Sequence, residues 1–414
     1  DQSLTPDSGS DNRADSPDRS IRSAEDRSAE EQWEKLVFEA SRLSGESDLS
    51  SRADAEEKLL EAHQVARELF SAQDIRRIKP LLGLGTLYQE TSQPLKALES
   101  LRRAHAALRS RTDQDLEMLS TVNHNLGRLY DQLGKHSKAQ AHYHEAIFAA
   151  ESRRMPDQET LASIQNNLAV SLMRELKFGD ALEPLDASVK IREALLADNS
   201  QNQELRERLL PELTESYVNI AYAHFFSDRA AQAQRYAHKA RALGSSGTPK
   251  GDLAQAALES LEATFKASSG DYSGAIGTMQ RAYQLSRSAL DPEDPSLMRY
   301  SIKLASMYLQ SGREDDAFEL LSPLRERYSE SLGEYHHDYA RVLVLLGNIA
   351  VFRDQPSEAK QLFLQGLERI SSEFGEKHKY ARNTLRDIVN FLEDCGQSEM
   401  ANAFRGRISG DSMH

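Results

Sequence analysis

The sequence has 414 residues, of which 39% are hydrophobic, and its formal net charge is -14 at pH 7. Such an acidic chain repels phosphate backbones and anionic membrane surfaces, which argues against nucleic-acid binding and membrane binding. Its single cysteine, Cys395, excludes an internal disulfide, and no apolar run reaches the length of about 18 residues that a membrane-spanning helix needs.

Residues 1–30 are strongly polar and include seven serines, eight acidic residues and four arginines. A segment with so few apolar groups cannot bury enough surface to offset the entropy lost on ordering. We therefore predict a disordered acidic tether over residues 1–30. Because the sequence begins with Asp rather than Met, we expect an extracytoplasmic protein that has lost an N-terminal signal, with a trimmed cytoplasmic chain as the alternative.

From residue 31 to residue 408 the chain repeats with a period of 42 residues, interrupted by one longer step of 52. The repeat is marked by alanine at nine positions in register: Ala55, Ala97, Ala139, Ala181, Ala233, Ala275, Ala317, Ala359 and Ala401. A second series of small residues runs twelve residues earlier, from Gly85 and Gly127 to a weaker match at Val389. The two series predict about nine copies of one structural unit.

Within each unit, apolar residues recur at spacings of three and four, which predicts two helices. In the stretch "NHNLGRLYDQLGKHSKAQAHYHEA", Leu126 and Tyr130 lie in the first helix, and Ala139 and Tyr143 lie in the second. A glycine stands between the two helices, where helices often end in a left-handed residue. The glycines at this position are Gly134, Gly270, Gly312 and Gly396. Small residues let the two helices approach closely, and a large residue such as Tyr143 fills the space beside them.

These units resemble the tetratricopeptide repeat, because Leu126, Gly127, Tyr130, Gly134, Ala139, Tyr143 and Ala146 match its pattern. The resemblance covers roughly residues 31–408. The 42-residue period and the connectors "LDPEDPSL" (290–297) and "LGEYHHDYA" (332–340) are similar to the kinesin light chain class of this repeat. The resemblance implies an all-α, right-handed superhelical solenoid of about nine helix-turn-helix units. A C-terminal tail is expected over residues 409–414.

The longer step places ten added residues within 188–212. The stretch "ADNSQNQELRERLLPE" is polar at first and then helical in pattern. We predict a surface insertion that either extends the second helix before it or forms a loop. Insertions in repeat arrays often lie on one face, where they can carry function.

The sequence contains no motif that indicates catalysis: it has no G-x-S-x-G, phosphate-binding loop, cysteine pair or H-E-x-x-H. His142 and His144 lie two residues apart on a predicted helix, so they point to different faces and cannot bind one ion together. Cys395 is a lone residue near a predicted helix end and is more typical of a packing residue than of a nucleophile. We predict a non-enzymatic protein without a cofactor or a metal site.

The resemblance implies that the first helix of each unit lines a concave groove that binds a partner. In register with the family, the predicted lining residues are His124, Asn125, Arg128, Asn166, Asn167, Arg174, Asn219, Tyr222, Arg299, Lys303, Arg341 and Asn348. An Asn amide both donates and accepts hydrogen bonds, so it can hold the backbone of an extended peptide. Basic residues in an acidic chain favour a partner with carboxylates. Alternatively, these residues are solvated or bridge neighbouring units.

We therefore predict a protein–protein interaction scaffold that binds a peptide segment of a partner. We expect the scaffold to have no nucleic-acid partner and to be a monomer. The alternative is a self-associating structural element of a larger complex. Light scattering over a dilution series separates the two, because only the second predicts association of the chain with itself.

Overall fold

The computed structural model describes residues 24–45, 49–71, 74–91, 93–111, 115–244, 247–292, 294–331 and 337–409. These residues form 18 α-helices and one short 3-10 helix, with no β-strand among them. The predicted all-α solenoid of about nine helix-turn-helix units is therefore confirmed. Most of the predicted tether, residues 1–23, and most of the predicted tail, residues 410–414, lie outside the described residues.

The helices pair in chain order into nine antiparallel units, and the two helices of each unit pack against each other. The first four units are α1 (Ala24–Ser44) with α2 (Leu49–Leu69), α3 (Lys79–Glu90) with α4 (Pro94–Arg109), α5 (Leu116–Gln132) with α6 (His136–Glu151), and α7 (Gln158–Arg174) with α8 (Leu182–Asp198). The last five are α9 (Gln203–Phe225) with α10 (Ala230–Leu243), α11 (Pro249–Ser268) with α12 (Tyr272–Ala289), α13 (Pro295–Gln310) with α14 (Glu314–Ser331), α15 (His337–Phe352) with α16 (Pro356–Phe374), and α17 (Lys379–Asp394) with α18 (Ser398–Ser409). The 3-10 helix η1 (Ile75–Arg77) precedes α3.

From the third unit to the ninth, the turn between the two helices uses a left-handed residue, as the glycine positions predict. Gly134, Gly270, Gly312 and Gly396 all have a φ angle between 72° and 85°. In the fourth, fifth and eighth units the same position holds Leu176, Asp228 and Asp354, with φ angles of 60°, 58° and 55°. The repeat therefore imposes this backbone conformation even where the residue has a side chain and the conformation costs roughly 1–3 kcal/mol.

The small residues of the first helix make room for a large residue of the second. A Cβ atom added at Gly127 would lie only 2.5 Å from the ring of Tyr143, and one added at Gly347 would lie 2.5 Å from the ring of Phe363. Both rings are fully buried, as are all nine alanines of the first series for which burial is described. The predicted packing inside the units is therefore confirmed.

One predicted boundary differs from the structure. The first helix, α1, begins at Ala24, so residues 24–30 belong to the solenoid rather than to the tether. Glu30 in this helix forms an ion pair with Arg76 of η1, which anchors the added turns.

The insertion within 188–212 extends the helix before it, which is one of the two predicted forms, and it also lengthens the helix that follows. Helix α8 ends at Asp198, five residues beyond the position that the end of α6 at Glu151 reaches after one step of 42. The Asn202 side chain accepts a hydrogen bond from the Leu205 backbone nitrogen at 3.0 Å, which starts α9 early. This helix therefore has 23 residues, compared with 17 in α7.

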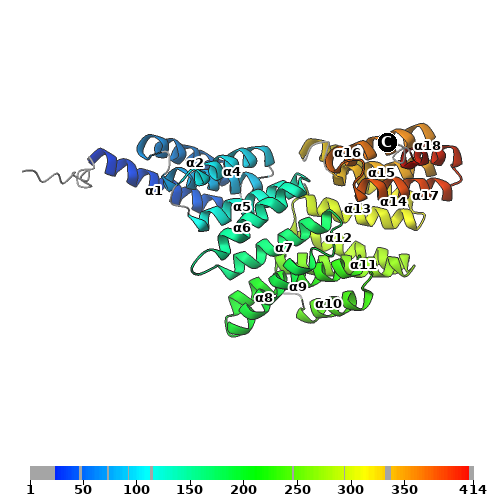
Figure 1. The fold of residues 1–414 in the computed structure, drawn as a ribbon, viewed down its shortest axis with the longest axis horizontal. Coiled ribbons are helices and arrows are strands. Elements are labelled where there is room, and N and C mark those ends of the chain that lie inside the picture. Colours follow the sequence, from blue (N-terminus) through cyan, green and yellow to red (C-terminus); the bar gives the residue numbers. More distant parts are fainter. Residues whose placement is uncertain are drawn as a thin grey trace, which may run out of the picture.

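The units follow a curved path through space (Figure 1). Helices α1–α4 and α15–α18 lie at the two upper ends of this view, and α8–α10 lie at its bottom. The curl brings distant units into contact, since the ring of His136 at the start of α6 stacks on the ring of Phe374 at the end of α16, with 6.2 Å between centroids. Within the described residues, no helix combines the length and the apolar character required to cross a membrane.

Candidate functional site

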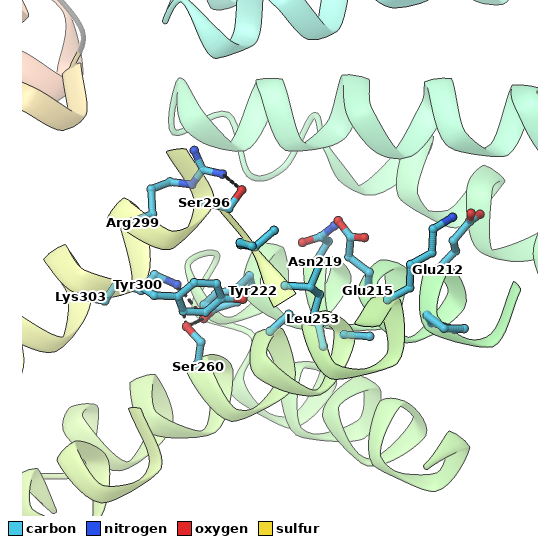
Figure 2. Close-up of a pocket in the computed structure, with 16 residues that line it drawn as sticks. Glu212, Glu215, Asn219, Tyr222, Leu253, Ser260, Ser296, Arg299, Tyr300 and Lys303 are labelled. Atoms are coloured by element: carbon cyan, nitrogen blue, oxygen red, sulfur yellow. Dashed lines mark hydrogen bonds between the residues drawn. The ribbon is translucent and has the colours of Figure 1, made fainter. Parts of the chain in front are cut away.

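Two adjoining cavities occupy the inner side of the curl, with volumes of about 1070 Å³ and 490 Å³. The larger cavity is lined mainly by the first helices of the units, from α5 to α17. The smaller cavity lies among α9, α11 and α13 (Figure 2). The residues that line both are Glu215, Asn219, Tyr222, Ser296, Arg299 and Lys303. We call the two cavities together the concave groove.

Eight of the twelve predicted site residues line the concave groove: Arg128, Asn167, Arg174, Asn219, Tyr222, Arg299, Lys303 and Arg341. The other four, His124, Asn125, Asn166 and Asn348, do not line these two cavities. Three of them face neighbouring helices: His124 and Asn166 bond to the following unit, and Asn125 bonds to the preceding one. A helix presents only a narrow stripe to the groove, so adjacent positions on it differ in what they contact.

The asparagines of three successive units each donate to the unit before them. Asn125 Nδ2 lies 3.5 Å from Thr86 Oγ1, and Asn167 Nδ2 lies 2.9 Å from His124 Nε2. Asn219 Nδ2 donates to Asn166 Oδ1 at 3.2 Å. These side chains therefore bridge neighbouring first helices in this structure, and their predicted contact with a peptide backbone stays a prediction.

Lys303 is the centre of the polar part of the smaller cavity. Its ammonium group donates to the hydroxyl of Tyr222 at 3.0 Å and to Ser260 Oγ at 2.9 Å (Figure 2). It also lies 4.7 Å from the centroid of the Tyr222 ring. Lys303 comes from α13, Ser260 from α11 and Tyr222 from α9, so this contact joins three successive units.

The larger cavity carries more basic than acidic side chains, with six of the former and four of the latter. Five of the basic residues have no carboxylate within 4.0 Å among the residues that the structure describes: Arg128, Arg174, Lys303, Arg341 and Lys379. Arg174 instead donates to the backbone oxygen of Asp131 at 3.2 Å. Unpaired cations in a groove attract anions and are shielded less than cations on an open surface.

The acidic residues of this cavity are mostly engaged within the protein. Asp131 accepts hydrogen bonds from Ser171 Oγ at 2.7 Å and from the hydroxyl of Tyr143 at 3.1 Å, and it lies 2.7 Å from His136 Nδ1. Asp294 caps α13 by accepting from the Ser296 backbone nitrogen at 2.7 Å. These carboxylates therefore support the fold as well as line the cavity, which keeps an excess of two basic side chains over the acidic ones.

Glu215 is the carboxylate that lies between the two cavities. Its side chain reaches water inside the groove, yet protein surrounds it, and this burial raises the pKa of the carboxyl group. Arg192 acts in the opposite direction, and the negative charge of Glu212 adds to the rise. Because water still reaches the carboxyl group, we expect the raised pKa to have only a modest effect on the stability of the fold.

The structure adds groove residues that the sequence did not single out, namely Lys250, Lys379, Tyr380 and Asn383. One signal could have found Asn383, because steps of 42 residues lead from Arg299 to Arg341 and then to Asn383. That position belongs to the ninth unit, where the series of small residues ends on Val389 and the repeat is weakest. Lys250 lies in the first turn of α11, which only the curvature of the solenoid brings to the cavity.

Two segments of the chain match family models of the tetratricopeptide repeat, over residues 120–151 and residues 297–372. These segments lie in the third unit and across the seventh and eighth units of the solenoid. No curated protein matches the chain in sequence.

Solved structures of similar fold cover nearly the whole chain. A Rap protein complexed with Competence and Sporulation Factor has a TM-score of 0.60 and 14% identity, and the match covers 93% of this chain and 97% of that one. The apo form of the quorum sensor NprR from B. thuringiensis has a TM-score of 0.56 and 10% identity, covering 93% and 99%. At these identities the similarity establishes the fold and not the ligand.

Proposed function

Because the chain is a tetratricopeptide-repeat protein, we propose that it is a non-enzymatic scaffold that binds a peptide segment of a partner protein in its concave groove. We propose further that this segment carries acidic groups. Repeat solenoids of this kind present an extended concave surface that binds a partner. The concave groove is the surface of this kind that the described residues form.

The observation that carries the proposal is the set of five basic groove residues without a carboxylate partner. A protein with a net charge of -14 has many carboxylates that could pair with them, yet these cations face the groove instead. A peptide carboxylate that enters the groove gains charge-assisted hydrogen bonds, which are about twice as strong as neutral ones. Lys303 offers such a bond beside two hydroxyl groups that already hold it in place.

The apolar part of the groove supports a peptide rather than a small inorganic anion. The smaller cavity is lined by Val218, Leu253, Ala257 and Leu290 as well as by the polar group around Lys303. Binding sites with mainly apolar walls and a few polar anchors suit ligands that carry apolar side chains. The Rap protein of similar fold was solved in complex with Competence and Sporulation Factor, which supports a binding role for a solenoid of this shape.

Selection from a random peptide library tests the proposal. The parent chain should select peptides enriched in Asp and Glu. A variant with Arg341→Glu and Lys379→Glu should lose this enrichment, because both side chains are exposed in the groove and their reversal repels acidic peptides.

The matched control is Lys190→Glu, which reverses an exposed charge of α8 that lines neither cavity. It should select the same peptides as the parent. The proposal is wrong if the parent shows no acidic enrichment, or if the double variant keeps the enrichment while its helical circular dichroism matches that of the parent.

A further inference from the structure

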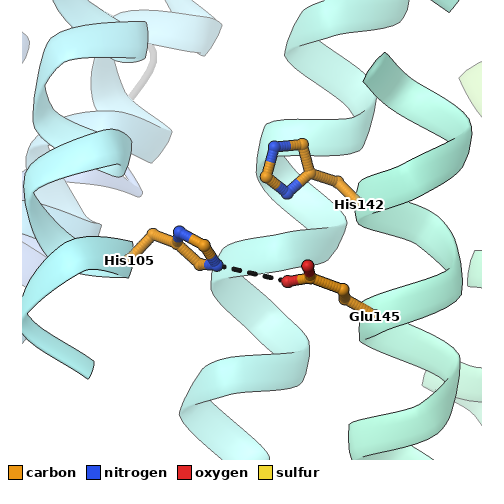
Figure 3. Close-up of side chains that lie close together, drawn as sticks. All are labelled: His105, His142 and Glu145. Carbon is orange, nitrogen blue, oxygen red and sulfur yellow. Dashed lines mark hydrogen bonds and ion pairs between the residues drawn. The ribbon is translucent and has the colours of Figure 1, made fainter. Parts of the chain in front are cut away.

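A second polar cluster lies away from the concave groove, between the second helices α4 and α6. His105 of α4 converges there with His142 and Glu145 of α6 (Figure 3). One ligand atom from each of the three side chains lies within 4.8 Å of the other two. His142 and Glu145 are three residues apart and share one face of α6, while His105 comes from the unit before.

We propose that His105, His142 and Glu145 bind a divalent transition-metal ion, with zinc as the preferred occupant. Two imidazole nitrogens and one carboxylate oxygen are a ligand set that zinc accepts, with water in the fourth position. Magnesium and calcium prefer sites made of oxygen atoms alone, so the two imidazoles select against them. This proposal is independent of the function of the concave groove.

The side chains need only small movements to hold such an ion. His105 Nε2 lies 3.3 Å from Glu145 Oε2. Two ligands of a tetrahedral zinc ion with bonds near 2.0–2.1 Å lie about 3.3–3.4 Å apart, so this pair already has the required spacing. No separation exceeds 4.8 Å, so each needs to shorten by at most roughly 1.5 Å, and Glu145, whose side chain is 44% exposed, has room to move.

Asn123 fixes the tautomer of the His142 ring that can bind a metal ion. The Asn123 amide nitrogen donates to the Leu119 backbone oxygen at 3.1 Å, so its carbonyl oxygen faces His142 and lies 2.8 Å from Nδ1. A carbonyl oxygen only accepts, which places the proton of the neutral ring on Nδ1 and the lone pair on Nε2.

Arg109 contacts the second oxygen of the Glu145 carboxylate. Its Nη1 atom lies 3.4 Å from Glu145 Oε1, while Oε2 is the oxygen next to His105. The guanidinium therefore engages one carboxylate oxygen and leaves the other for the ion. An ion at this place would connect α4 of the second unit with α6 of the third, and it would stabilise the stacking of these two units.

The sequence predicts no metal site because His142 and His144 point to different faces of one helix. The structure supports that reasoning for His144, which is exposed, but it supplies His105 as a different partner for His142. The histidine pair is formed across two units, so spacing within one helix could not reveal it.

Equilibrium dialysis of the full chain, free of any histidine tag, against Zn²⁺ tests the site. The parent should bind one zinc ion that Glu145→Gln and His105→Ala each weaken by about tenfold or more. Glu145→Gln keeps the size and shape of an exposed side chain, so a loss of zinc binding in this variant cannot be explained by a disturbed fold. Cobalt in place of zinc should give the visible absorption of a tetrahedral site in the parent.

His144→Ala is the matched control, because it removes an exposed imidazole of the same helix and should leave the affinity for zinc unchanged. Zinc should also raise the melting temperature of the parent and of His144→Ala, and raise that of Glu145→Gln less at the same zinc concentration. The proposal is overturned if the parent binds no more zinc than Glu145→Gln, or if His144→Ala weakens binding as much as His105→Ala.

Discussion

At the scale of single residues, the asparagines of the first helices have two possible uses, and the structure shows one of them. Asn167 donates to His124 of the preceding unit at 2.9 Å. If this bridge matters for stability, Asn167→Ala should leave a half-buried imidazole without its partner and lower the free energy of unfolding by about 1–3 kcal/mol. Urea denaturation followed by circular dichroism measures this loss.

The control for that change is Asn390→Ala, which truncates an exposed residue of α17 and should leave the urea midpoint nearly unchanged. A parent-like midpoint for Asn167→Ala would show that the bridge contributes little. The Asn167 amide would then be available to a bound peptide, as the sequence predicts.

His124 should also make stability depend on pH. Burial and, to a lesser extent, the nearby charge of Arg128 lower the pKa of this histidine from 6.5 to about 4. Between these two values the unfolded chain binds more protons than the folded chain, so stability falls as pH falls through this window. Chemical denaturation at several pH values should show a smaller fall for His124→Gln than for the parent. Equal slopes would contradict a neutral His124 in the folded chain.

At the scale of helices and units, the close approach of the two helices predicts opposite effects at two glycines. Gly127→Ala brings a Cβ atom to 2.5 Å from the Tyr143 ring and should destabilise the chain by about 1–3 kcal/mol. Gly277→Ala, within α12, meets nothing within 4 Å and should stabilise it by about 0.4–1 kcal/mol. Thermal melts of the two variants should therefore shift in opposite directions. A shift of the same sign would contradict the packing inside the units.

The sequence was sufficient to predict the units because the constraints inside a unit are local. Ala139 and Tyr143 are four residues apart on one helix, and Gly127 faces them from the other, so their spacing already describes the contact. The contact between Lys303 and Tyr222 depends instead on how strongly successive units rotate. Spacing alone places both residues in the groove, but it does not predict that Lys303 reaches across two units to that hydroxyl.

At the scale of the whole molecule, the curl determines which residues can meet one ligand. The contact between His136 and Phe374 joins the third unit to the end of the eighth. The larger cavity consequently has Arg128 and Lys379 in its wall, although they lie in the third and ninth units. The repeat predicts that Arg128 lines the groove, but it does not predict that Lys379 shares the same cavity, because the period does not give the pitch of the superhelix.

The central claim is that the concave groove binds an acidic peptide through its unpaired cations. Titration of the parent and of Lys303→Met with the acidic peptide that the parent selects tests it most directly. Hydrogen bonds to a charged group contribute about 1.5–3 kcal/mol, so Lys303→Met should bind roughly 10–100-fold more weakly while keeping the apolar stem of the lysine. Added salt should weaken the parent more than the variant. Equal dissociation constants for the two proteins, with unchanged helical content, would contradict the claim.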